Sequence, residues 1–65
     1  MELSEIAKAL ISGMEAFKVR RGISAQIFLM LDGDEEYLEM IHYMQDHLDA
    51  TGEELLQQAM RIVEQ

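Results

Sequence analysis

The two residues with the clearest potential for metal chemistry are Glu39 and His42. They have the Glu-x-x-His spacing of di-iron helical bundles, which places both side chains on one face of a helix. A symmetric dimer would supply two copies of the pair, but such bundles also need glutamates that project inward from other helices. Both residues fall on the rim of a polar face. We therefore expect surface side chains and no cofactor, with Glu39 and His42 as the metal candidates to check.

A second candidate for cation binding is the acidic run Asp32-Gly33-Asp34-Glu35-Glu36. A calcium-binding EF-hand loop that starts at Asp32 needs glycine at its sixth position and glutamate at its twelfth. This chain has Tyr37 and Tyr43 at those positions. Acidic residues also stabilise the start of a helix, because they face the positive end of its dipole. The run therefore predicts a helix start and not a calcium site.

Enzymatic activity is not expected from this chain. Its 65 residues include no cysteine, which excludes disulfides and thiolate ligands. It contains no Gly-x-Ser-x-Gly elbow, phosphate-binding loop or dinucleotide fingerprint. A chain of this length buries only roughly 60% of the surface that its unfolded form exposes. A deep catalytic cleft needs more chain than that.

Charge is unevenly distributed along the sequence, and the net charge is −8. Residues 1–22 contain four Lys or Arg and three Glu, whereas residues 23–65 contain one Arg and ten Asp or Glu. Phosphate would be repelled by the second region, and DNA-binding proteins normally present a basic stripe. Nucleic acid is therefore disfavoured as a partner.

The concentration of positive charge in the chain is Lys18, Arg20 and Arg21. We expect these residues in the last turn of a first helix, where cations offset the helix dipole, with Gly22 as a left-handed stop. The cluster could also hold a phosphate or dock an acidic partner. One such partner is the acidic run 32–36 of a neighbouring subunit, although exposed pairs add only about 0–1 kcal/mol each.

Hydrophobic periodicity predicts helices in three of the four segments that glycine and polar clusters separate. Ser4 is expected to cap the first helix, and Thr51 with Glu54 has the spacing of a capping box. The short segment from Ser24 to Leu31 fits a buried helix or a buried strand. We favour a helix capped by Ser24, because the chain offers no second strand to pair with it.

These elements predict a single all-α domain over residues 1–65, a small bundle of three to four short helices. The last two helices are joined by few residues, so they should form a helical hairpin or corner. The expected helices span approximately residues 3–20, 24–31, 34–48 and 52–64.

A surplus of apolar residues is the main indication of function. Hydrophobic residues make up 49% of the chain and six are methionine, a residue common on adaptable binding surfaces. Folds of this size have little interior and are marginal without oligomerisation or staples. We therefore expect some apolar side chains to contact another molecule. The candidate interface residues are Phe28, Met30, Tyr37, Met40, Tyr43, Met44 and Met60.

The sequence thus favours a self-associating protein–protein interaction or regulatory module, a homodimer or other homo-oligomer that acts in the cytoplasm and not in a membrane. One alternative is an acidic decoy or inhibitor that occupies a cationic, nucleic-acid-binding site of a partner protein. Another is a regulator that associates with DNA through a helix-turn-helix formed by the last two helices. The exposed face of the would-be recognition helix carries more Glu than Arg, which phosphate would repel.

Overall fold

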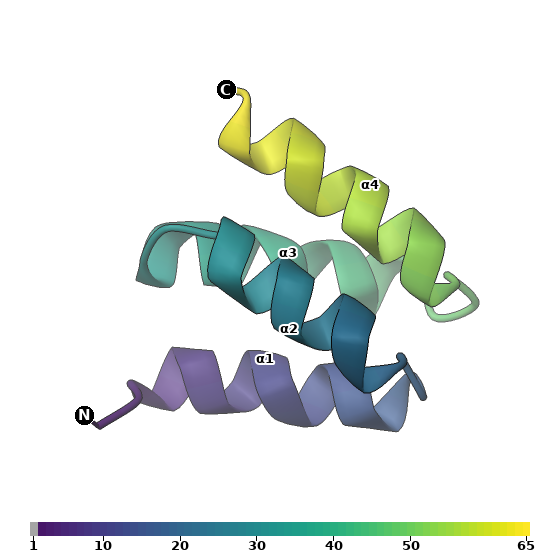
Figure 1. Cartoon of the computed structure of the whole chain (residues 1–65), viewed down its shortest axis with the longest axis horizontal. Coiled ribbons are helices and arrows are strands. Elements are labelled where there is room, and N and C mark those ends of the chain that lie inside the picture. Colours follow the sequence, from purple (N-terminus) through teal and green to yellow (C-terminus); the bar gives the residue numbers. More distant parts are fainter. Residues whose placement is uncertain (1) are drawn as a thin grey trace.

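The computed structural model describes residues 2–65. This part of the chain is all-α and contains no strand, as the hydrophobic periodicity predicted. Figure 1 shows the four helices, with α1 and α4 on opposite sides of the molecule and α2 in front of α3. The helices are α1 (Glu5–Ala16), α2 (Arg21–Met30), α3 (Asp34–Asp46) and α4 (Gly52–Val63).

Consecutive helices run in alternating directions, and the main packing joins α1 to α3 and α2 to α4 (Figure 1). Helices α1 and α3 run in the same direction (Figure 1), and Ser4 at the start of α1 contacts Asp34 at the start of α3. Helices α2 and α4 run in the direction opposite to that of α1 and α3 (Figure 1). Gly52 at the start of α4 lies against Val19 just before α2. Helices α3 and α4 are also in contact, as the short connection between them predicted.

The core draws side chains from all four helices. Its fully enclosed members include Leu10 and Met14 on α1, Ile27 on α2, Met40 on α3 and Leu55 on α4. No polar or charged side chain is buried among residues 2–65. Packing of apolar helix faces is therefore the main stabilising interaction of this fold.

Gly13 lies where α1 packs against Met44 of α3. A β-carbon at this position would lie 3.1 Å from Cε of Met44, so the small residue makes room for the methionine of the neighbouring helix. This packing accounts for a glycine in the middle of a helix, where it costs roughly 1 kcal/mol relative to alanine.

The N-terminal caps of two helices agree with the sequence prediction. The Ser4 hydroxyl accepts a hydrogen bond of 3.0 Å from the Ala7 amide at the start of α1. Thr51 and Glu54 form the complete capping box of α4, in which each side chain accepts a hydrogen bond from the backbone amide of the other residue. These contacts pair amides that would otherwise lack a partner.

The end of α1 and the start of α2 differ from the prediction. Helix α1 ends at Ala16, and the left-handed residue after it is Lys18, with φ of 60°, and not Gly22. The Val19 amide bonds the carbonyl of Met14 at 3.1 Å and the Lys18 amide bonds that of Glu15 at 2.9 Å. This is the hydrogen-bond pattern of a Schellman motif.

The second segment is helical, which settles the choice between helix and strand. Helix α2 begins at Arg21, one turn earlier than predicted, so Gly22 lies inside it and Ser24 is not its cap. The early start follows from the Schellman turn, which reverses the chain within four residues of the end of α1.

Candidate interaction surface

Two of the predicted interface residues belong to the core. Met40 is 0% exposed and Met44 is 3% exposed, so neither side chain is presented at the surface of this subunit. Helix α3 packs against α1 and against α4, which widens its buried face beyond the narrow stripe that sequence spacing suggested. Both methionines therefore serve packing within the subunit.

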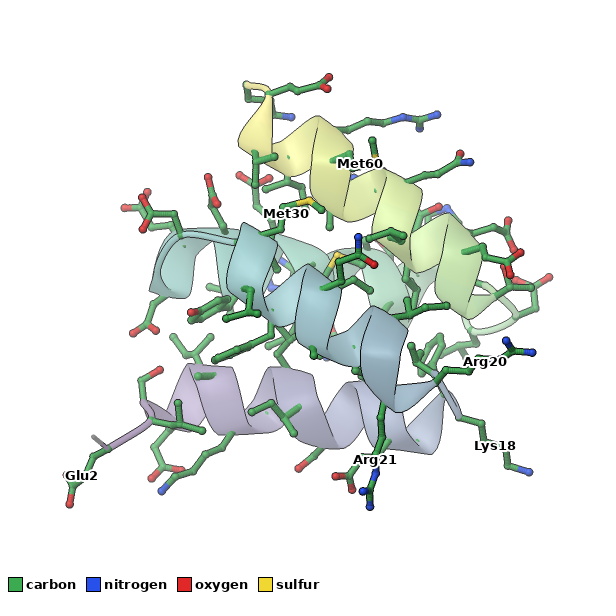
Figure 2. All side chains as sticks on the ribbon, in the orientation of Figure 1. Glu2, Lys18, Arg20, Arg21, Met30 and Met60 are labelled. Atoms are coloured by element: carbon green, nitrogen blue, oxygen red, sulfur yellow. The ribbon has the colours of Figure 1, made fainter. Side chains whose placement is uncertain are left out.

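The other five predicted residues are spread over several helices. Phe28 of α2 and Tyr37 of α3 stack with ring centroids 5.1 Å apart, and Tyr43 stacks on His47 within α3. Phe28, Met30, Tyr37 and Tyr43 are half-buried and pack against the core. Met60 is 45% exposed on α4 (Figure 2). The structure places them on α2, α3 and α4.

The most exposed large apolar side chain of the described residues is Leu29, at 82%, which the sequence analysis did not select. It shares one solvent-facing side of α2 with Gly22, Ala25 and Gln26, all of them exposed. Their spacing is that of one helix face. We call these four residues the α2 outer face. It carries no charged side chain, although the protein has a net charge of −8.

A groove lies beside the α2 outer face, between α1 and α2. It has a volume of about 520 Å³. Helices α1 and α2 pack against each other less extensively than the main helix pairs do, which leaves this space open. Its lining is largely apolar and comprises Ile11, Met14, Glu15, Val19, Arg21, Ser24, Ala25 and Phe28. Ala25 belongs to the groove and to the α2 outer face, so the two form one surface.

The basic cluster lies at the start of α2 and not in the last turn of α1. Arg20 is the N-cap residue of α2 and Arg21 is its first residue. Figure 2 shows Lys18, Arg20 and Arg21 extending from the end of the molecule where α2 begins. Arg20 and Arg21 at the start of α2 oppose its dipole, whereas Lys18, two residues after the end of α1, is favourably placed for the dipole of α1.

None of these three cations forms an ion pair within residues 2–65. The ion pair found among residues 2–65 is Lys8 with Glu5, at 3.8 Å. Glu15 shares the groove with Arg21, and Glu53 lines a small hollow with Lys18 and Arg20, but no ion pair forms in either place.

The acidic run 32–36 lies at the opposite end of α2, where the chain turns into α3. Glu36 Oε1 accepts a hydrogen bond of 2.6 Å from the Asp32 amide, and Asp34 accepts one of 2.7 Å from the Ser4 hydroxyl. The side chains of Asp32 and Glu35 are exposed and make no hydrogen bond or ion pair within residues 2–65. The run opens α3 as an acidic first turn, as predicted.

Glu39 and His42 are both exposed on α3. Among residues 2–65 no group of three or more His, Asp or Glu side chains is arranged to hold a metal ion. The pair therefore lacks the additional ligands that a di-iron site requires.

Leu48 is the second strongly exposed leucine, at 78%, and it lies between α3 and α4. It lines a smaller hollow of about 240 Å³ on the side of α1 that faces α3. Asp46 and Asp49 lie within two residues of it in the sequence, whereas no charged residue lies within two residues of Leu29. Scattered apolar residues of this kind are common on protein surfaces.

Comparison with known proteins adds no assignment: no protein-family model, curated protein or solved structure matches this chain. In the part of the chain that the structure describes, every helix is too short or too polar to cross a membrane.

Proposed function

We propose that this protein is a self-associating helical interaction module and that its working form is a homodimer. The observation that carries the proposal is the α2 outer face, where Leu29 stands 82% exposed among uncharged residues of the helix. The groove beside it adds Ile11, Val19 and Phe28 to this surface, with Glu15 and Arg21 as its charged members. Contact with another molecule would remove the apolar atoms of this surface from water.

The size of this surface predicts a weak dimer. A helix of ten residues is about 15 Å long, so an interface centred on α2 is at the low end of specific interfaces. Burying a leucine contributes about 1.5–3 kcal/mol, and a symmetric dimer buries two. Because the cost of association cancels most of this gain, we expect a dissociation constant between about 0.1 and 1 mM.

Sedimentation equilibrium over a concentration series from about 1 µM to about 1 mM tests the proposal. The expected result is a mass that rises from one chain toward two chains within this range. A mass of one chain at every concentration would rule the proposal out. The apolar contact should also persist in high salt, because screening acts on charge and not on apolar burial.

A second candidate function is supported by the exposed carboxylates along one side of α3. Glu35, Glu39 and Asp46 are exposed and are separated by four and seven residues, which aligns them along one face of the helix. Such a row of carboxylates would suit an acidic inhibitor that occupies a cationic site of another protein. Titration with a lysine-rich peptide tests this candidate. It predicts binding that weakens at least about tenfold between low and high salt and that Glu39→Gln weakens further. Equal binding by the variant would count against this candidate.

A further inference from the structure

The two ends of α2 carry opposite charges. Lys18, Arg20 and Arg21 precede or begin the helix, and the acidic run 32–36 follows it. In Figures 1 and 2 the basic end is the right-hand end of α2, and the turn into α3 is at the other end. The α2 outer face lies between them and is uncharged. One helix therefore presents a positive end, an apolar middle and a negative end.

This order makes the surface complementary to a second copy of itself. We propose that two subunits pair through their α2 outer faces in antiparallel orientation, about a twofold axis near the middle of α2. Each basic end then meets the acidic end of the other subunit, and both contacts are attractive. A parallel pairing would place like charges together at both ends. This inference rests on the proposed self-association and specifies its partner and orientation.

The spacing along α2 is consistent with such a pairing. With the axis between Ala25 and Gln26, Leu29 of one copy lies over Gly22 of the other. The space there is open, because a β-carbon on Gly22 would meet no atom within 4 Å. Lys18 and Gly33 lie outside α2, three residues before its start and three residues after its end. The pairing therefore brings the turn that contains Lys18 of one copy toward the turn that contains Gly33 of the other.

The placement of the cations supports a contact outside the subunit. At the start of a helix they are less favourable than acidic residues would be, and none forms an ion pair among residues 2–65. Lys18 also occupies a left-handed position for which glycine is the preferred residue. Lys18 follows the last turn of α1, where a cation is favourable, but Arg20 and Arg21 meet an opposite charge only in the antiparallel dimer.

Charge reversal at each end provides the test. The variant Lys18→Glu/Arg20→Glu changes the basic cluster from a net charge of +3 to −1, and Asp32→Lys/Glu35→Lys changes the acidic run from −4 to zero. Each variant alone should dimerise at least about tenfold more weakly than the wild type, because both contacts between ends become repulsive in the first variant and lose their attraction in the second. The second variant has a smaller net charge than the wild type. If general repulsion between copies were the main effect, this smaller charge would strengthen association, which is the opposite of the result expected here.

The decisive experiment is to mix the two variants. In a heterodimer of the two, the unchanged basic end meets the unchanged acidic end and attracts it, while the two altered ends, with net charges of −1 and zero, neither attract nor repel strongly. We expect the equimolar mixture to dimerise more strongly than either variant alone, as measured by sedimentation equilibrium. Circular dichroism of each variant confirms that it remains helical.

The outcomes separate the two proposals. A wild type that stays monomeric overturns both self-association and the antiparallel pairing. A wild type that dimerises, with variants that associate normally or a mixture that shows no recovery, overturns the antiparallel pairing alone. Recovery in the mixture, weaker in high salt, supports it.

Discussion

The hydroxyl of Ser4 donates a hydrogen bond of 2.7 Å to Oδ1 of Asp34, thirty residues further along the chain. The same hydroxyl accepts a hydrogen bond from the Ala7 amide, so one side chain caps α1 and links it to the start of α3. This bond helps to fix the parallel arrangement of α1 and α3, on which the position of the rest of the bundle depends.

Ser4→Ala should lower the free energy of unfolding by about 1 kcal/mol, because the cap and the link to Asp34 are both lost. For a chain of this size the melting temperature should fall by about 4–8 °C per kcal/mol. Thermal unfolding of Ser4→Ala, Asp34→Ala and the double variant measures the coupling between the two residues. Effects that add to within about 0.3 kcal/mol would mean that the hydrogen bond contributes nothing.

Lys18→Gly should stabilise the subunit by about 0.5–1 kcal/mol. Lys18 has φ of 60°, a conformation that is strained for residues with a β-carbon and unstrained for glycine. Part of the gain is offset by the greater freedom of glycine in the unfolded chain. Urea unfolding should show a higher midpoint than the wild type, with Lys18→Ala as the control that removes the charge but keeps the strain. A lower midpoint for Lys18→Gly than for Lys18→Ala would contradict the left-handed assignment.

Gly33→Ala should destabilise the protein by about 1–3 kcal/mol. Gly33 has φ of 89° and ψ of 176°, a region that is essentially restricted to glycine. A β-carbon there would meet no neighbouring atom, so backbone strain and not a clash causes the loss. Gly22→Ala is the matched control, since Gly22 lies in a helix and also has open space around it. Equal stability of the two variants would show that the turn before α3 does not require glycine.

Local signals explain which features the sequence predicted well. The helices follow from apolar periodicity, and the caps at Ser4 and Thr51 follow from hydroxyl groups that need only a nearby amide. The turn after α1 was mispredicted because Lys18, Arg20 and Arg21 have the composition of a helix C-terminus. The Schellman turn at Lys18 forms without glycine. Its hydrogen bonds join backbone groups, so the residue types do not indicate them.

The candidate surface was harder to predict because it depends on how the helices pack. Residues 27–31 are all apolar, so their spacing does not show which of them faces water once the segment is helical. Leu29 is exposed and Ile27 is buried because α2 packs against α4. The residues of α2 alone do not indicate this packing. The same reason applies to Met40 and Met44, which were expected at an interface and lie in the core.

The central prediction is that the α2 outer face joins two copies of the chain. Leu29→Gln and Leu48→Gln test it as a matched pair, because both leucines are strongly exposed and neither substitution changes the net charge. Both variants should unfold at the wild-type temperature. In sedimentation equilibrium, Leu29→Gln should weaken the dimer by about tenfold or more, since two apolar contacts are lost, while Leu48→Gln should match the wild type. A dimer that is insensitive to Leu29→Gln, or as sensitive to Leu48→Gln, would contradict the claim.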